Sequence, residues 1–188
     1  MFRIIHTKEE NNQFDELWGD FCEENEIPFL KRTDQVTRYG ICDDEKKLIG
    51  TIELSKFDCK LENENYFYEF SRNKYIKFIK NEKIYEISKL LIDRENRGKG
   101  HFKQILLACF DHATSTDADW YIGTINKRLY MFARSMGFKI VPIDEYFNIS
   151  DNIIAVPFLL DAKHAIHLMQ YSQEFKDLLM YYENKIKQ

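Results

Sequence analysis

The stretch that most constrains the fold is residues 86–110, EISKLLIDRENRGKGHFKQILLACF. Its first part, residues 86–93, contains the uninterrupted apolar run LLI, which is typical of a strand covered on both faces. A basic turn with two glycines follows, and residues 102–113 then repeat apolar side chains at helical spacing. The sequence therefore predicts a strand, a glycine-rich turn and an amphipathic helix in direct succession.

The turn between the predicted strand and helix has the chemistry of a phosphate site. The first N–H groups of a helix have no partner within the helix, and the helix dipole favours an anion there. Glycine allows the backbone to approach a ligand closely, and basic side chains add positive charge. We therefore expect an anion to be bound by Arg97, Gly98, Lys99, Gly100 and His101.

Composition limits the class of protein. A chain of 188 residues with 44% hydrophobic content can bury a core as one domain, residues 1–188. A net charge of −4 does not support a nucleic-acid partner. The four cysteines are widely spaced, and neither an export signal nor an apolar run long enough to span a membrane is present. We therefore expect a cytoplasmic protein with no membrane partner.

The order of the predicted elements indicates an α+β domain. A helix over residues 13–24 and two antiparallel strands precede alternating strands and helices, so we expect a mixed, mostly antiparallel sheet with helices on both faces. A polar loop is expected over residues 144–151. The C-terminal helices, residues 161–187, carry an apolar stripe, and apolar residues beside that stripe predict either a homodimer contact or packing on the parent domain.

An insertion at residues 55–83 joins two predicted strands and is rich in aromatic residues. A connection of this length in a compact domain is usually functional or locally folded. Two interpretations stand side by side: the aromatic residues cover a sheet edge, or they form a lid or wall of a substrate pocket.

Two motifs in this order resemble the GCN5-related N-acetyltransferase (GNAT) superfamily. The phosphate motif of that superfamily is matched by the run from Arg97 to Phe102, and its second motif by Asn126 followed by Gly137-Phe138. The resemblance covers residues 37–160. It implies the GNAT-like acyltransferase fold, acetyl-CoA or another acyl-CoA as co-substrate, a small-molecule or peptide amine as acceptor, and no metal.

The resemblance also implies positions for the donor. Its pantetheine arm would follow the strand edge at Leu91, Ile92 and Asp93, where a backbone N–H can polarise the thioester carbonyl. Asn126 would contact the same donor. Phe102 stands where the family has a small residue, and its place on the apolar helical stripe predicts that it packs into the core.

Glu86 is the candidate general base. It lies eleven residues before Arg97, a spacing at which some family members carry a catalytic glutamate. The acceptor amine arrives as an ammonium and must lose a proton before it attacks the thioester, and a nearby carboxylate can take that proton. The alternative is a glutamate that pairs with a Lys or Arg or points into solvent.

Tyr130 is the candidate acid for the departing thiolate. The family often has a tyrosine where this chain has Ala133, and Tyr130 lies about one turn earlier on nearly the same helical face. The alternative is an ordinary half-buried tyrosine, because a thiol with a pKa near 8.5 can leave as thiolate unaided.

The run Glu86-Ile87-Ser88-Lys89 is similar to the Glu-x-Ser-Arg run of acyl-homoserine-lactone and long-chain N-acyl amino acid synthases, which often take acyl chains from acyl carrier protein. Three hypotheses follow: an N-acetyltransferase as the first expectation, a long-chain synthase of this branch, or a non-catalytic binding module. His164 and His167 share a helical face but lack a third convergent ligand, so we expect no metal site.

Overall fold

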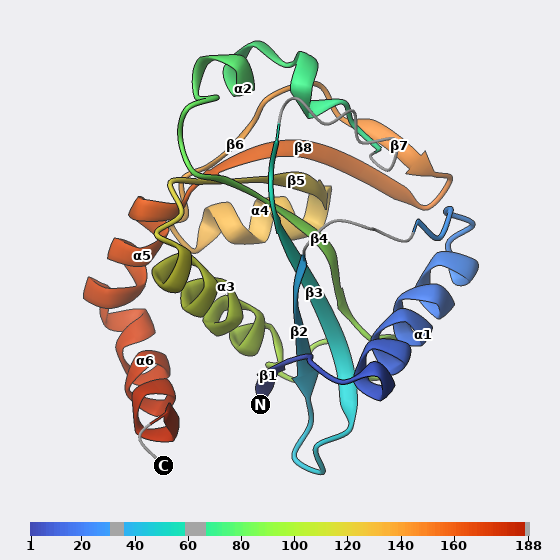
Figure 1. Ribbon diagram of the computed structural model, residues 1–188, viewed down its shortest axis with the longest axis vertical. Coiled ribbons are helices and arrows are strands. Elements are labelled where there is room, and N and C mark those ends of the chain that lie inside the picture. The colour runs from blue at the N-terminus through green and yellow to red at the C-terminus, as the bar shows by residue number, and fades with distance from the viewer. Residues whose placement is uncertain (31–35, 59–66, 187–188) are drawn as a thin grey trace.

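The computed structural model describes residues 1–30, 36–58 and 67–186, and Figure 1 shows the remaining segments as a grey trace. The described residues form eight strands, six α-helices and two short 3₁₀ turns. The strands are β1 Phe2–Ile4, β2 Val36–Cys42, β3 Leu48–Lys56, β4 Ile84–Ile92, β5 Trp120–Asn126, β6 Ile140–Pro142, β7 Phe147–Ser150 and β8 Ile153–Asp161. The helices are α1 Lys8–Glu24, α2 Lys74–Phe78, α3 Phe102–Thr116, α4 Lys127–Ser135, α5 Ala162–Tyr171 and α6 Gln173–Ile186, and the 3₁₀ turns are η1 Phe70–Arg72 and η2 Arg94–Asn96.

The sheet runs in the order β1-β2-β3-β4-β5-β8-β6, and β7 pairs with β8. Among the strands that the structure describes, only β4 and β5 pair in parallel, so the expected mixed, mostly antiparallel sheet is confirmed. These two strands pair over Ile84–Glu86 and Trp120–Ile122 and then diverge, as Figure 1 shows. The sheet is therefore split along its centre beyond Glu86.

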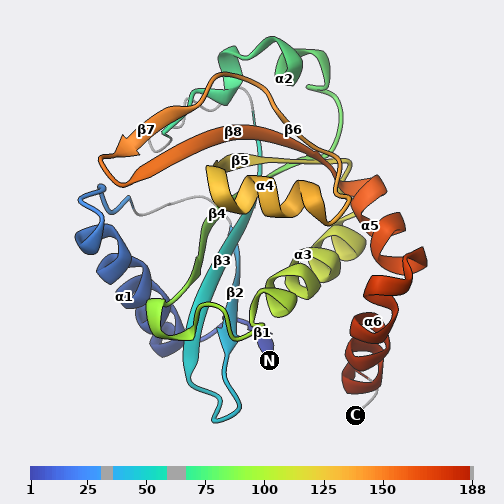
Figure 2. The ribbon, with the colours of Figure 1, turned by 180° about the vertical axis from the view of Figure 1, so that it is seen from behind.

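Helices cover both faces of the sheet, as expected (Figures 1 and 2). The larger core cluster includes Tyr39, Ile52 and Leu54 of the sheet, with Ile105 and Ala108 of α3 packed on them. A smaller cluster is built around the buried residues of η1 and α2, and α1 packs separately over β3. Where β4 and β5 no longer pair, the sheet does not separate its two faces.

Two predicted element boundaries were wrong. Helix α1 begins at Lys8, five residues before the predicted start, because Thr7 and Glu10 form a capping box in which the Thr7 hydroxyl accepts from the Glu10 N–H. The predicted polar loop over residues 144–151 contains β7, which pairs with β8. That pairing is a tertiary contact with a strand that follows later in the chain, so local composition did not indicate it.

The C-terminal helices pack on the parent domain. The α6 residues Phe175 and Leu179 are buried against Leu107 of α3 and Met169 of α5. The hydroxyls of Tyr39 and Tyr182 both donate to the carboxylate of Asp111 on α3, which ties β2, α3 and α6 together. The homodimer contact stays a prediction. Across the described ranges, no helix has both the length and the apolar character to cross a bilayer.

Candidate functional site

The glycine-rich turn has a backbone shape that few residues other than glycine adopt. Gly98 has φ 77° and Gly100 has φ 85°, both in the left-handed region. The turn is held at its start by Asp93, whose carboxylate accepts from the Asn96 N–H at 2.8 Å. The Nε of Arg97 donates to the Ile92 carbonyl at 2.9 Å, which fixes the turn to the end of β4.

The start of α3 leaves a row of N–H groups available to a ligand. His101 caps the helix without a side-chain hydrogen bond, and within the described part of the chain the N–H groups of residues 98–102 donate no hydrogen bond. A Cβ added at Gly98 or Gly100 would meet no atom within 4 Å, so the surrounding space is open. Such a row of N–H groups is suited to an anion, and anion binding at this turn stays a prediction.

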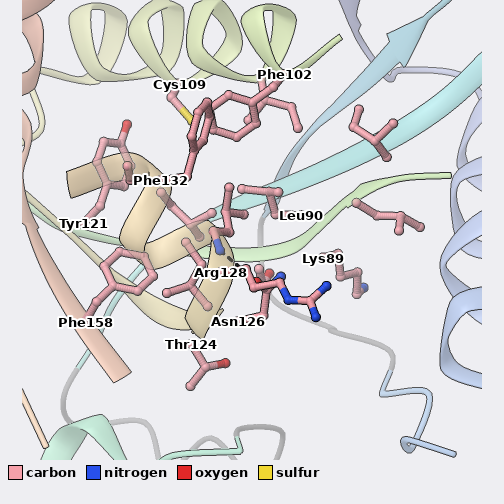
Figure 3. A pocket seen from close by; sticks show the side chains of 18 of the residues that line it. Lys89, Leu90, Phe102, Cys109, Tyr121, Thr124, Asn126, Arg128, Phe132 and Phe158 are labelled. Atoms are coloured by element: carbon pink, nitrogen blue, oxygen red, sulfur yellow. Dashed lines mark hydrogen bonds between the residues drawn. The ribbon is translucent and has the colours of Figure 1, made fainter. Parts of the chain in front are cut away.

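Phe102 packs as predicted from its place on the apolar stripe. Its ring lies against the main core and meets the ring of Phe132 edge to face, with centroids 5.3 Å apart. Figure 3 shows Phe102, Cys109 and Phe132 close together below α3. The large residue therefore turns inward from the turn and leaves the row of N–H groups uncovered.

A cavity of about 1440 Å³ opens beside this turn and follows the split between β4 and β5. On the α3, α4 and α5 side, its apolar chamber is lined by Cys109, Ala113, Tyr121, Phe158, Ala165 and Met169, among others. On the α1 and η1 side, its polar chamber is lined by Trp18, Glu53, Phe70, Glu86, Ser88 and Lys89, among others. Enzyme and ligand pockets commonly measure about 300–1,000 Å³, so this cavity is large.

The side chains that define the apolar chamber are uncharged near neutral pH. Burial raises the pKa of the Cys109 thiol to about 12, so this side chain stays a neutral thiol. Burial also lowers the pKa of His112 to about 4, against the opposing effect of Asp111. Neutral His112 holds the Tyr121 hydroxyl at 2.7 Å, which satisfies the polar atom of that cavity-lining side chain. The chamber is suited to an apolar group.

Glu86 lies at the point where the two central strands part. Its residue is 3% exposed, it lines the cavity, and it is the last residue of β4 that pairs with β5. In the ladder with β3 it stands opposite Ser55. The structure thus places the candidate base beside the split through which a donor would meet an acceptor, while its role stays a prediction.

A buried ion network, which we did not predict, lies on the polar side of the cavity. Glu53 is 0% exposed, and its Oε2 lies 2.8 Å from Nε of Arg38 and 2.9 Å from Nζ of Lys89. Arg38 also pairs with Asp15 of α1 at 3.0 Å. The other carboxylate oxygen of Glu53 accepts from the Ser88 hydroxyl at 3.3 Å. A signal was present, because Arg38 and Glu53 are charged side chains in the middle of strands whose other residues are mostly uncharged.

Lys89 has an unusual backbone conformation. Its φ is 48°, and the β3–β4 register shifts at this point, between Thr51 and Glu53. A lysine in the left-handed region is uncommon, and such a bulge re-aims a side chain next to an active site. Figure 3 shows Lys89 on the β4 side of the cavity, away from the aromatic group below α3.

The remaining donor-site candidates divide into two groups. Leu91, Ile92 and Asn126 line the cavity, and Asn126 also caps α4 by accepting from the Leu129 N–H at 2.8 Å. Asp93 and Lys99 are not among the cavity-lining residues in the described part of the chain. Both act within the turn instead, Asp93 as the cap of η2 and Lys99 by donating to the Asn96 side chain at 3.2 Å.

Tyr130 does not face the cavity. Its side chain is 1% exposed, and its hydroxyl lies 3.5 Å from Nη1 of Arg134, which donates to it. Tyr130 is absent from the described residues of α4 that line the cavity, which are Lys127, Arg128, Leu129, Met131, Phe132 and Ala133. The geometry therefore gives the proposed acid no direct contact with a bound donor.

Family comparison agrees with this geometry. The model of the acetyltransferase (GNAT) family matches residues 5–138, so the chain belongs to the GNAT family. A search of curated proteins finds no match to this chain. The fold and the family match thus agree, and the class of protein is the GNAT family.

Several solved structures share the fold. FeeM, an N-acyl amino acid synthase from uncultured soil microbes, has a TM-score of 0.68 at 14% identity over 94% of this chain and 96% of that chain. BjaI, a CoA-dependent acyl-homoserine lactone synthase, has a TM-score of 0.64 at 13% identity over 89% and 86%. An acyl-CoA N-acyltransferase from Pseudomonas aeruginosa has a TM-score of 0.58 at 15% identity over 85% and 98%.

Proposed function

We propose that this chain transfers a long acyl group from a thioester donor to the amine of an amino acid. The observation that carries the proposal is the apolar chamber behind the split between β4 and β5. An acetyl group would leave most of that chamber unfilled. The long-chain hypothesis is therefore preferred to the N-acetyltransferase that we first expected.

The position of the chamber fits a donor held by the glycine-rich turn. A donor whose phosphates sit at Gly98 to Phe102 would place its thioester near Leu91, where β4 no longer pairs with β5. An acyl chain attached there can enter the apolar chamber beside Phe132 and extend toward Tyr121. The side chains that define that chamber are neutral, so an acyl chain bound there buries no charged group and incurs no desolvation cost from one.

The polar chamber suits an acceptor with both an amine and a carboxylate. Glu86 can receive the ammonium, and Lys89 can face the carboxylate because its only ion-pair partner in the described chain, Glu53, is shared with Arg38. These two side chains stand three residues apart on one strand and line the same cavity. FeeM, by its description, makes N-acyl amino acids, which supports this class of acceptor.

In the proposed reaction the amine nitrogen attacks the thioester carbonyl carbon. Glu86 takes the proton of the ammonium, directly or through a water molecule. A backbone N–H of β4 stabilises the oxyanion, the C–N bond forms and the C–S bond breaks. The sulfur leaves as thiolate, since its pKa near 8.5 requires no strong acid. The amide keeps one of the three ammonium protons, so the nitrogen loses a second one after the C–N bond forms, and this proton passes to the thiolate or to solvent, as does the first from Glu86.

Native mass spectrometry with three donors tests the proposal. We would offer acetyl-CoA, dodecanoyl-CoA and dodecanoyl acyl carrier protein, and follow with a mixture of amino acids and detection of the acylated products. We expect a dodecanoyl donor to bind more tightly than acetyl-CoA and to yield an N-dodecanoyl amino acid. Tighter binding of acetyl-CoA than of the dodecanoyl donors would favour an N-acetyltransferase. Binding of none of the three donors would favour a non-catalytic binding module.

Ala165→Phe provides an internal check on the chamber. The larger ring fills space on the α5 wall of the cavity and does not touch the glycine-rich turn. We expect it to weaken dodecanoyl-CoA binding while acetyl-CoA binding stays unchanged. An equal loss for both donors would contradict the assignment of the chamber to the acyl chain.

A further inference from the structure

Helix α2 presents aromatic side chains to solvent. Phe78 is 90% exposed and Tyr75 is 49% exposed, whereas Ile76 between them is fully buried. Ile76 belongs to the core cluster that also contains Phe70 and Ile122, so the helix is anchored and its outer face is fixed. Single exposed apolar residues are common, but an anchored helix that points two aromatic rings outward indicates a contact surface.

Lysines surround these rings. Lys74, Lys77 and Lys80 are exposed, and in the described part of the chain none of them has an ion-pair partner. Lys74 Nζ lies 5.1 Å from the centre of the Tyr75 ring. Residues 69–83 carry five basic and two acidic side chains in a chain whose net charge is −4. We call Lys74, Tyr75, Lys77, Phe78 and Lys80 the α2 patch.

We propose that the α2 patch binds the surface of an anionic lipid bilayer. Lysines near such a surface gain electrostatic attraction, and their long side chains can reach headgroups while the rings enter the interface. Protein interfaces are depleted in lysine and prefer arginine, so the composition of the patch favours a membrane over a protein partner. The patch attaches the domain to a surface and requires no membrane-spanning helix.

The patch lies next to the cavity. Phe70 of η1, which directly precedes α2 in the chain, lines the polar chamber and packs in the same core cluster as Ile76. A bilayer held at α2 would therefore lie on the outer side of the segment that forms this wall (Figure 1). This inference revises the expectation of no membrane partner, and it stands on the surface residues alone, independently of the proposed function.

Vesicle sedimentation tests the inference. The full chain would be mixed with vesicles of phosphatidylcholine alone, and with vesicles that contain equal amounts of phosphatidylcholine and phosphatidylglycerol. We expect binding to the anionic vesicles only, and release by added salt, because salt screens charges beyond about 10 Å at 0.1 M ionic strength. Equal binding to both kinds of vesicle, or binding to neither, overturns the inference. Binding to neither would favour an acidic protein as the partner of the α2 patch.

Substitutions in the patch make the test specific. Replacing Lys74, Lys77 and Lys80 by Gln should lower partition into anionic vesicles roughly a hundredfold, about fivefold for each lysine. Phe78→Ala should lower it roughly tenfold, since the ring no longer enters the interface. All four side chains are exposed, so the fold should tolerate these changes.

A matched control carries the same change of charge elsewhere. Lys8, Lys46 and Lys47 lie at the start of α1 and in the β2–β3 turn, at the other end of the molecule from α2 (Figure 1). Replacing these three by Gln should leave vesicle binding within twofold of the wild type. If the control loses as much binding as the patch variant, the attraction depends on overall charge and the inference is overturned.

Discussion

Nζ of Lys89 lies 2.9 Å from Oε2 of Glu53, and Nε of Arg38 lies 2.8 Å from the same oxygen. One fully buried carboxylate oxygen thus holds two cations from two different strands. Opposite charges that are buried together depend on each other, because removing one partner leaves an uncompensated charge in a medium of low dielectric. This relationship joins the stability of the sheet to the electrostatics of the polar chamber.

Glu53→Gln should strongly destabilise the protein. The amide can keep the hydrogen bond from Ser88, but Arg38 and Lys89 would share a buried space with one negative charge fewer. We expect the free energy of unfolding to fall by about 3–5 kcal/mol. Urea denaturation followed by circular dichroism measures it.

The double variant Glu53→Gln/Lys89→Met separates charge from shape. It removes one positive charge along with the negative one, and leaves Arg38 paired with Asp15. We expect it to be more stable than Glu53→Gln alone. If the double variant loses the sum of the two single effects, the three side chains do not act as a coupled network.

Glu86→Gln should remove general-base catalysis without affecting the donor. We expect kcat/KM for the amine to fall roughly 10²- to 10⁴-fold, while the dissociation constant of the acyl-CoA stays the same. The acidic limb of the pH profile should also disappear. Glu82→Gln, an exposed change in the turn before β4, is the matched control and should have no effect. An unchanged pH profile in Glu86→Gln would assign the proton transfer to another group.

Gly100→Ala should weaken donor binding through the backbone alone. Gly100 has φ 85°, and no atom lies within 4 Å of an added Cβ, so any effect comes from conformation and not from a clash. Alanine is disfavoured in this region by about 1–2 kcal/mol, so the donor dissociation constant should rise roughly five- to thirtyfold. Isothermal titration with coenzyme A measures the change.

Gly19→Ala is the control for that substitution. Gly19 lies inside α1, and an added Cβ would make only ordinary contacts with Phe29, at 3.8 Å and 3.9 Å. Alanine is a better helix former than glycine, so this variant should gain about 0.5–1 kcal/mol of stability and bind coenzyme A like the wild type. Weakened binding in this variant would indicate that the effect of Gly100→Ala is not local.

His112 should make the fold sensitive to acid. Burial lowers its folded-state pKa to about 4 from 6.5, so the unfolded chain binds a proton in a range where the native protein does not. Stability should therefore decrease as the pH falls from about 6.5 to about 4, by about 3 kcal/mol. Denaturation at several pH values measures this slope, and His112→Asn should flatten it. A wild-type slope that His112→Asn leaves intact would point to another group.

Several local features could be predicted because their determinants are adjacent in the chain. The turn from Arg97 to Phe102, the cap at Asn126 and the inward packing of Phe102 depend on a few neighbouring residues, and the structure has each of them. The start of α1 was also encoded locally, in Thr7 and Glu10, but it was missed. Strand β7 was missed for a different reason, since only its pairing with β8 makes it a strand.

The sequence by itself determined the family and the succession of strand, turn and helix, because these three elements are contiguous over residues 86–110. Only the tertiary structure decided what the site can accommodate. The cavity exists because β4 and β5 diverge after Glu86, and the ion network joins Arg38, Glu53 and Lys89 from three strands. Distances between residues that are far apart in the chain depend on how the sheet assembles, and no local pattern of side chains encodes them.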